Sequence, residues 1–167
     1  MSTFRILGID PGFGLTGLGV VDVTGGDATH VWHDVISTPT EQPFGERLQA
    51  VRNDVTEAIR RFQPQAAAVE SLFFQSNAKT AIKVGMARGV ILLALADLNI
   101  PMVEVTPSQV KQGIAGWGNA DKKQVGEMVT RLLKLKEVPK PDDAADALAL
   151  AIVGGLMFRS LVLLKRA

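Results

Sequence analysis

Three apolar stretches joined by very short connections open the sequence, and they restrict the fold more than any other feature. The stretches cover residues 4–10, 15–23 and 28–37, and the connections are rich in glycine. Antiparallel strands can be joined by turns this short, whereas parallel strands need a crossover of a dozen or more residues. This part of the chain therefore predicts three antiparallel strands.

Helical spacing replaces the strand pattern from residue 44 onward. Apolar residues recur every three or four positions and stop before Pro64: Phe44, Leu48, Val51, Val55, Ile59 and Phe62. We expect further strands over 66–72 and 102–105, a loop over 113–120, and helices over 78–98, from Pro107, over 122–135 and from a capping Asp142 or Asp143 to about 164. The pattern predicts an α/β fold, in which a five-stranded mixed sheet is flanked by helices within a single domain spanning 1–167.

The composition excludes several kinds of site. The chain has no cysteine and only two histidines, His30 and His33, which excludes disulfides, thiolate catalysis and zinc sites built on cysteine. A metal site must therefore use carboxylates, which suit Mg²⁺ or Mn²⁺. The longest uncharged apolar run near the C-terminus covers 12 residues, 147–158, whereas a membrane-spanning helix needs about 20. We expect a cytoplasmic protein with no membrane partner.

Two carboxylates stand where apolar strands are expected to end. Asp10 follows Ile6-Leu7-Gly8-Ile9, and Glu70 follows Ala66-Ala67-Ala68-Val69. Either residue could simply face water at a turn or at a strand end. A carboxylate on a buried strand, however, needs a cation or a hydrogen-bond donor as its partner. Two of them on neighbouring strands indicate a functional site.

A second pair of carboxylates lies near the start of the last expected helix. Asp143 and Asp146 are three residues apart and therefore share one helical face, and Asp146 is surrounded by alanines and a leucine. Helix capping explains Asp143, but it does not explain Asp146, which lies inside an alanine-rich segment. Two carboxylates from strands and two from one helix suit two divalent metal ions, one activating water and one stabilising the leaving oxygen of a phosphodiester.

The charges are unevenly distributed, although the net charge is only +1. Residues 1–57 carry 3 basic and 8 acidic side chains, whereas residues 105–141 carry 7 basic and 3 acidic ones. The second segment is typical of a surface that binds a polyanion. Residues 12–17, GFGLTG, match the dinucleotide fingerprint, but a strand is expected from residue 15 to residue 23, where the fingerprint needs a helix. We interpret these glycines as part of a tight hairpin.

Four segments together resemble the RuvC family of Holliday-junction resolvases, which have an RNase H-like fold. They are ILGIDPG at 6–12, VESLF at 69–73, DAADAL at 143–148, and VKQ at 110–112 with GWGNADK at 116–122. The resemblance spans nearly the whole chain in the family's order and spacing. It implies a homodimeric endonuclease of the bacterial cytoplasm that cuts four-way DNA junctions by paired symmetric nicks in recombination and repair. It also implies the branch-migration proteins RuvA and RuvB as partners.

The resemblance also implies roles for individual residues. Asp10, Glu70, Asp143 and Asp146 would bind two Mg²⁺ or Mn²⁺ ions per active site, Lys122 would act in catalysis and contact DNA, and Lys111 would contact the DNA backbone. Phe73 matches the aromatic residue that stacks on a base near the junction centre, whereas Phe74 is expected to pack in the core. No role is transferred to Lys123. Because Asp142 precedes Asp143 directly, either residue could be the metal ligand, although the DAADAL spacing favours Asp143.

The helix expected over 78–98 resembles the family's dimer helix. One of its faces carries mostly small residues that allow close approach of another helix: Ala81, Gly85, Arg88, Gly89, Leu92 and Ala96. Packing inside the core explains the same pattern equally well. Two other functions remain as alternatives. A fragment of an actin-like ATPase would need a second phosphate loop and a longer chain, and a non-catalytic junction-binding protein would not need the four acids.

Overall fold

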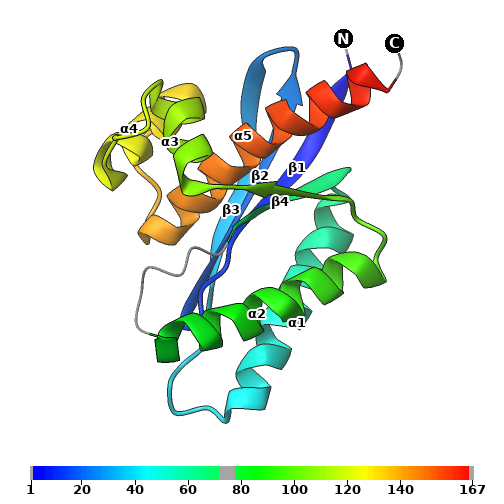
Figure 1. Ribbon diagram of the computed structural model, residues 1–167, viewed down its shortest axis with the longest axis vertical. Coiled ribbons are helices and arrows are strands. Elements are labelled where there is room, and N and C mark those ends of the chain that lie inside the picture. The colour runs from blue at the N-terminus through cyan, green and yellow to red at the C-terminus, as the bar shows by residue number, and fades with distance from the viewer. Residues whose placement is uncertain (1, 72–77, 166–167) are drawn as a thin grey trace.

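The computed structural model describes residues 2–71 and 78–165 and contains one sheet with helices on both of its faces (Figure 1). The strands are β1 (Thr3–Asp10), β2 (Leu15–Thr24), β3 (Asp27–Ser37), β4 (Ala66–Glu70) and β5 (Met102–Val105). The helices are α1 (Phe44–Phe62), α2 (Ala78–Asp97), α3 (Pro107–Ala115), α4 (Lys122–Leu132) and α5 (Asp142–Leu164).

The sheet has the order β3-β2-β1-β4-β5. The pairs β1–β2 and β2–β3 are antiparallel, whereas β4 is parallel to both β1 and β5. This arrangement confirms the predicted five-stranded mixed sheet with three antiparallel strands at its start. It also places β1 in the centre of the sheet, where one neighbour is antiparallel and the other is parallel.

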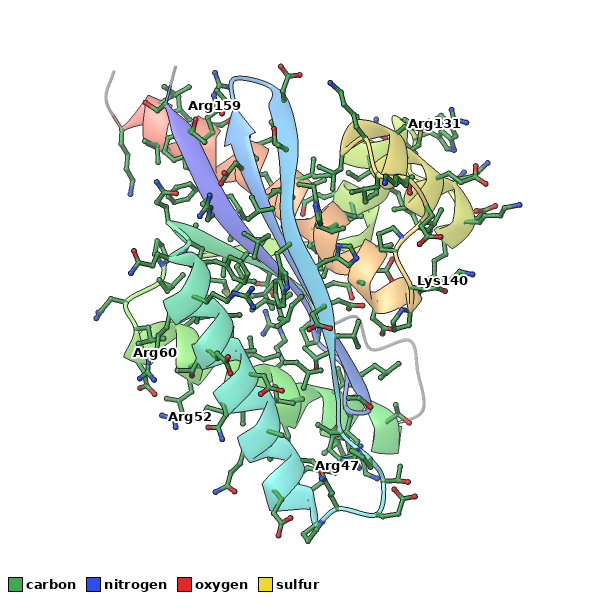
Figure 2. All side chains as sticks on the ribbon, turned by 180° about the vertical axis from the view of Figure 1, so that it is seen from behind. Arg47, Arg52, Arg60, Arg131, Lys140 and Arg159 are labelled. Carbon is green, nitrogen blue, oxygen red and sulfur yellow. The ribbon has the colours of Figure 1, made fainter. Side chains whose placement is uncertain are left out.

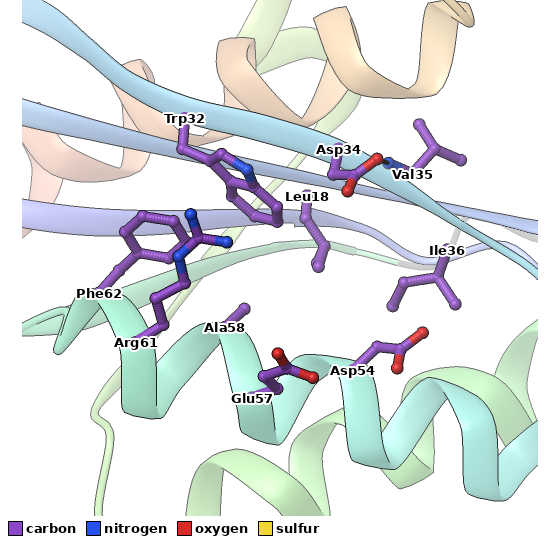
Figure 3. A pocket seen from close by; sticks show the side chains of 10 residues that line it. All are labelled: Leu18, Trp32, Asp34, Val35, Ile36, Asp54, Glu57, Ala58, Arg61 and Phe62. Carbon is purple, nitrogen blue, oxygen red and sulfur yellow. Dashed lines mark hydrogen bonds between the residues drawn. The ribbon is translucent and has the colours of Figure 1, made fainter.

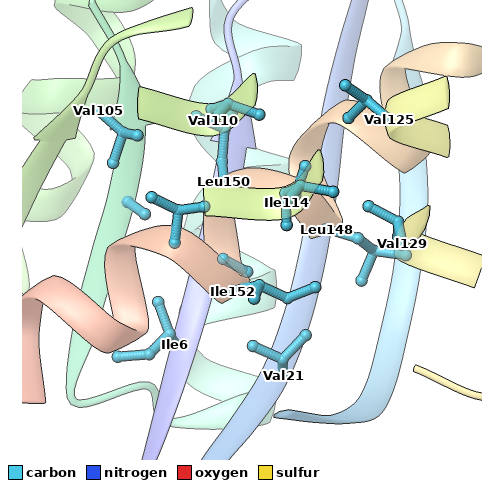
Figure 4. Packing of buried hydrophobic residues seen from close by; sticks show 14 of the residues in the cluster. Ile6, Val21, Val105, Val110, Ile114, Val125, Val129, Leu148, Leu150 and Ile152 are labelled. Carbon is cyan, nitrogen blue, oxygen red and sulfur yellow. The ribbon is translucent and has the colours of Figure 1, made fainter. Parts of the chain in front are cut away.

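Successive side chains of β1 alternate between two hydrophobic cores, as the two-residue period of a strand requires. Ile6 belongs to the core under α5, whereas Leu7 and Ile9 belong to the core under α1 and α2. Helices α3 and α4 extend the first core beyond the sheet, and Figure 4 shows Val110, Val125 and Leu148 from three different helices meeting there. The core under α5 therefore contains side chains from α3, α4 and α5 as well as from the sheet.

Glycines and alanines let α5 lie unusually close to β1 and β2. A Cβ atom at Gly8 would overlap the Ala147 carbonyl oxygen, and one at Gly19 would lie 2.8 Å from the Leu148 nitrogen. Distances below about 3.0 Å do not occur for real Cβ atoms, so the helix can hold this position only over glycine. The close approach fixes where the first turns of α5, which carry Asp143 and Asp146, sit over the sheet.

Several predicted boundaries shift. Helix α3 continues to Ala115, where the predicted loop had already begun, and ends because Gly116 adopts a left-handed conformation with a φ of 85°. The strand predicted to run to 72 ends at Glu70, and α4 ends at Leu132 instead of 135. The residue before α5 is Pro141, and neither Asp142 nor Asp143 caps this helix, since both lie inside its first turn.

Helix α5 is apolar enough to resemble a membrane span by composition. Its most apolar 18-residue window has a mean hydropathy of 2.2, and half of that window is buried inside the protein. The core helix of a globular domain shows the same composition, because it packs on a sheet with one face and on other helices with another. The burial of Ala147 to Gly155 against the sheet, α3 and α4 accounts for the hydropathy of α5.

Candidate active site

Asp10 and Glu70 end two adjacent parallel strands at the same edge of the sheet. Ile9 pairs with Val69 across β1 and β4, so the following residues, Asp10 and Glu70, are level with each other. Ile9 and Val69 point into the core under α1 and α2. Because side chains alternate, Asp10 and Glu70 point to the opposite face, where α5 lies. The structure thus places these two carboxylates, which the sequence singles out, on neighbouring strands at one edge of the sheet.

The start of α5 adds Asp143 and Asp146 to the same edge. Gly17 of β2 pairs with Asp10 of β1, and a Cβ atom at Gly17 would overlap the carbonyl oxygen of Asp143. Helix α5 therefore begins directly over the strand pair that carries Asp10. Gly17 belongs to the glycine-rich segment that the sequence analysis assigned to the hairpin. Gly12 has that turn role, since a Cβ there would overlap the Leu15 carbonyl, whereas Gly17 serves helix packing.

The side chains of Thr38 and Arg47 hold the turn that follows Asp10. The hydroxyl of Thr38 donates to the Phe13 carbonyl oxygen at 2.7 Å, and Nη2 of Arg47 donates to the same oxygen at 2.9 Å. Arg47, at the start of α1 (Figure 2), is 6% exposed, and its guanidinium stacks on the Phe13 ring at 3.7 Å. These contacts fix the β1–β2 turn and hence the end of β1.

Burial and mutual repulsion shift the titration of the carboxyl groups. Burial, followed by the charges of Glu70, Asp146 and Asp143, raises the pKa of Asp10 to about 8. Burial and the charge of Asp146 raise the pKa of Glu70, and burial is also the main cause of the raised pKa of Asp146. Strongly raised carboxyl pKa values indicate negative charge that is concentrated without a sufficient counter-charge.

Lys122 supplies part of the missing positive charge. Its Nζ lies 2.9 Å from Oδ2 of Asp146 and 3.8 Å from Oδ2 of Asp142. Although burial alone would lower it, the hydrogen bond to Asp146 and the charges of the nearby aspartates raise the pKa of Lys122. Lys122 is the first residue of α4, and Asp121 caps that helix through a hydrogen bond from the Gln124 backbone. The capped helix start thus holds the lysine beside the carboxylates.

The four carboxylates match a hard divalent cation in their chemistry. All four offer oxygen ligands of the kind that Mg²⁺ and Mn²⁺ prefer. A cation would favour the ionised form of Asp10, whose pKa is raised first by burial and then by the neighbouring carboxylates. Within 2–71 and 78–165, no three histidine or acidic side chains are close enough to hold one ion in the observed arrangement. The donors thus fit a metal by their chemistry but would have to move closer together to bind it, and the pairing of Lys122 with Asp146 is one contact that metal binding would have to exchange.

Lys111 joins the same site from α3. A cavity of about 230 Å³ lies between the sheet edge and helices α3, α4 and α5, and eight residues line it: Glu70, Pro107, Val110, Lys111, Lys122, Val125, Asp146 and Leu150. Both lysines singled out in the sequence therefore border the same cavity as two of the acids. Phe73 and Phe74 lie outside the described residues, 2–71 and 78–165.

Arg88 is a site residue that the sequence analysis placed on the face of a dimer helix instead. Its Nε donates to the Glu70 carbonyl oxygen at 3.1 Å, and its Nη2 lies 2.6 Å from Oε1 of Glu104. Only 15% of the Arg88 side chain is exposed. A signal was present in the sequence, because Arg88 is the one charged residue between Val84 and Ala96.

A second cavity, of about 270 Å³, lies between β3 and α1 on the other side of the sheet (Figure 3). Trp32 stacks on Phe62 at one end of it, and Asp34, Asp54 and Glu57 approach from the two elements. Burial and the charges of Glu57 and Asp34 raise the pKa of Asp54. None of the site residues that the sequence singled out lines this cavity, so the candidate active site lies at the α5 face.

Known proteins are similar to this chain in both sequence and fold. A family model for the crossover junction endodeoxyribonuclease RuvC matches residues 6–154. RuvC of Thermotoga maritima is 48% identical over 160 residues, which are 96% of this chain and 95% of that protein. RuvC of Moorella thermoacetica is 50% identical over 147 residues, 88% of either chain.

Two solved structures extend the comparison. Thermus thermophilus RuvC in complex with Holliday junction substrate superposes with a TM-score of 0.89 at 40% identity, covering 94% of this chain and 96% of that one. The yeast mitochondrial Holliday junction resolvase Ydc2, at 14% identity, has a TM-score of 0.61 and shares the fold over 95% of this chain and 84% of its own. The chain therefore belongs to the RuvC family of crossover junction endodeoxyribonucleases, and its predicted RNase H-like fold is confirmed.

Proposed function

We propose that this chain resolves four-way DNA junctions by metal-dependent phosphodiester hydrolysis at the edge formed by β1, β4 and the start of α5. The observation that carries this proposal is the convergence of Asp10, Glu70, Asp143 and Asp146 from three separate elements on one face of the sheet. The alternative of a junction-binding protein without activity gives no reason for such concentrated negative charge. The ATPase alternative conflicts with family membership.

The four acids would hold two Mg²⁺ or Mn²⁺ ions. When bound, such ions supply an activated water and stabilise the leaving oxygen. The chain's own part is to orient the carboxylates: α5 is held over Gly17, and the end of β4 is held by Arg88. Asp142 is exposed and lies 3.8 Å from Lys122, so we assign it to the lysine and keep Asp143 as the metal ligand.

Lys111 and Lys122 would bind the DNA. Lys122, released from Asp146 when metal is bound, would be free to contact the scissile phosphate, and Lys111 borders the same cavity. Further basic side chains lie on α4 and on the segment before α5, where Figure 2 shows Arg131 and Lys140 on the far side of the sheet from Arg52 and Arg60 of α1. Phosphate contacts of this kind dominate the affinity of proteins for DNA. Phe73, by family resemblance, would stack on a base near the junction centre.

A homodimer would form through α2. Ile82, Met86 and Leu93 are exposed on this helix, and together with Gly89 they recur every three or four residues in a seam suited to a second helix. Of the face predicted from the sequence, Gly89 and Ala96 are exposed, whereas Arg88 turns inward to Glu70 and Glu104. The proposed seam is therefore rotated relative to the predicted one. Two copies would present two active sites, as paired nicking of a four-way junction requires.

The compartment and the wider partners follow from the family. We propose that residues 1–167 act as one nuclease domain in the bacterial cytoplasm, where the chain would meet four-way junction DNA together with RuvA and RuvB. No surface of this chain is assigned to RuvA or RuvB.

Cleavage of an end-labelled four-way junction tests the proposal directly. Wild-type protein should produce symmetric nicks in the presence of Mg²⁺ and none in the presence of a chelator. Asp146→Asn should bind the junction with an affinity near that of the wild type and lose cleavage, because it removes a metal ligand and leaves the phosphate contacts in place. Junction binding without cleavage by the wild type would favour the non-catalytic alternative. Normal nicking by Asp146→Asn would overturn the metal assignment.

A further inference from the structure

An exposed tryptophan stands between the two lysine-bearing helices of the site. Trp117 lies in the connection from α3 to α4, and 52% of it is exposed. Lys111 precedes it by six residues and Lys122 follows it by five, and both lysines border the cavity that also contains Glu70 and Asp146. A large aromatic surface left open to water beside a cationic nucleic-acid site is typical of a side chain that stacks on a nucleotide.

The connection that carries Trp117 is fixed at both ends. At its start, Nε2 of Gln112 donates to the Gly116 carbonyl at 2.8 Å, and Gly116 closes α3 in a left-handed conformation. At its end, the buried Ala120 donates from its backbone to the Trp117 carbonyl at 3.4 Å, and Asp121 caps α4. An indole on such a loop loses little additional freedom on binding, which favours its use as a recognition surface.

The loop also lies close to the start of α3. A Cβ atom at Gly118 would have Ser108 Oγ as its nearest neighbour at 3.8 Å. Ser108 follows Pro107, which lines the cavity with Glu70 and Lys111. The loop therefore folds back toward the start of α3, the end of that helix that is nearest to the carboxylates.

We propose that Trp117 stacks on an unpaired or unstacked DNA base of the junction, next to the strand that Lys111 and Lys122 hold by its phosphates. The inference rests on the proposed function, since it takes junction DNA as the ligand. A duplex keeps its bases stacked on one another and offers no free base face, whereas the branch point of a four-way junction is where a base can be displaced. Trp117 thus adds recognition of an open base to recognition of phosphates.

Tryptophan emission reports this contact directly, because the chain has two tryptophans, Trp32 and Trp117. Trp32 stacks on Phe62 on the opposite side of the sheet and serves as the internal control. On titration with junction DNA in a chelator, the wild type and Trp32→Phe should show quenched emission, whereas Trp117→Phe, which keeps only Trp32, should not. A linear duplex of the same sequence should quench Trp117 far less than the junction does.

Affinity provides the second measurement. Trp117→Ala should weaken junction binding by about 5- to 150-fold, the range of one lost stacking contact, and Trp117→Phe should retain most of the affinity. The slope of log Kd against log salt should stay at the wild-type value, since no phosphate contact is lost, whereas Lys111→Ala should reduce it by about one. The melting temperature of Trp117→Ala should match the wild type because the side chain is exposed.

The outcomes separate this inference from the proposed function. Wild-type binding and nicking are measured with labelled DNA and do not depend on Trp117 emission. A wild type that nicks junctions while Trp117 emission stays constant at saturation would overturn the inference and leave the proposed function intact. Equal quenching by duplex and junction, or wild-type affinity of Trp117→Ala, would overturn it as well.

Discussion

The Nε of Arg88 lies 3.1 Å from the carbonyl oxygen of Glu70, and this hydrogen bond connects the proposed dimer helix to the proposed metal site. Arg88 also pairs with Glu104 of β5 at 2.6 Å. The arginine therefore ties α2 to the ends of two strands at once. The position of the Glu70 carboxylate depends on the end of β4, and the end of β4 depends in part on α2.

Arg88→Ala should lower cleavage by about 10- to 100-fold, the usual effect of losing a residue that orients a metal ligand. Junction affinity should stay near the wild-type value, and the Mg²⁺ concentration for half-maximal cleavage should rise. Rates of junction nicking measured over a Mg²⁺ series give both quantities.

The matched control is Arg52→Ala, which removes another arginine–carboxylate pair that involves α2, the exposed Arg52–Asp97 pair at 2.9 Å. Exposed pairs of this kind contribute about 0–1 kcal/mol to stability, and Arg52 has no contact with Glu70. An unchanged Mg²⁺ requirement for Arg88→Ala, or an equal shift for Arg52→Ala, would show that Arg88 does not position the ligand.

Asp10 makes the stability of the metal-free protein dependent on pH. With a folded-state pKa of about 8 against an unfolded value of 3.8, folded Asp10 binds a proton more tightly than unfolded Asp10 does. Its contribution to stability is therefore complete below the unfolded pKa and is lost as the pH rises from about 4 to about 8. Asp10→Asn, which imitates the protonated form, should melt above the wild type at pH 8.5 and close to it at pH 4.

Mg²⁺ should reduce this difference in melting temperature at pH 8.5. The cation replaces the proton as the partner of Asp10, so it should raise the melting temperature of the wild type at pH 8.5 more than that of Asp10→Asn. Each kcal/mol of relieved repulsion corresponds to about 2–4 °C for a chain of this size. Calorimetry with and without Mg²⁺ measures both effects, and a melting difference that is the same at the two pH values would contradict the assignment.

Adding a single methyl group at Gly17 should push the start of α5 away from the sheet. A Cβ there would overlap the backbone of Asp143, so Gly17→Ala must push the start of α5 outward. We expect a loss of about 1–3 kcal/mol in unfolding free energy and a loss of cleavage in the protein that remains folded. Gly14→Ala is the control in the same hairpin, because nothing lies within 4 Å of its Cβ position. Similar effects for the two variants in denaturant titrations and nicking assays would speak against the close approach as the cause.

Much of this architecture was accessible from the sequence because it depends on local pattern. The helix predicted over 44–62 matches α1, whose apolar residues repeat along one face and whose end follows from Pro64. The four acids were also found from local context, since a carboxylate in an apolar strand or in an alanine-rich helix needs a partner. Predicting that these acids lie at one edge of the sheet required only the order of the strands.

Contacts between distant segments were not accessible in the same way. The local pattern predicts a turn role for Gly17, since nothing in GFGLTG indicates that α5, more than a hundred residues later, lies over this glycine. The sequence pattern places Arg88 on a helix face that suits a dimer contact and core packing equally well. It does not identify the partners of Arg88, Glu70 and Glu104, because they belong to two strands whose pairing no local pattern specifies. The end of α3 at Gly116 was placed too early because helix propensity alone does not decide between Gly113 and Gly116 as the stop.

The exposed seam of α2 contains a leucine at its centre. Leu93 is 53% exposed and lies between Gly89 and Ala96 on the helix, so a second copy of α2 would cover it in the proposed dimer. Leu93→Glu should produce a monomer in analytical ultracentrifugation, because a buried carboxylate without a partner opposes association. It should also replace paired nicks by slow single nicks on a four-way junction. Leu161→Glu changes a leucine that is equally exposed, at 51%, on the last turns of α5, and it should leave both the mass and the paired nicking unchanged. A dimer that persists in Leu93→Glu at micromolar concentration would exclude this seam as the interface.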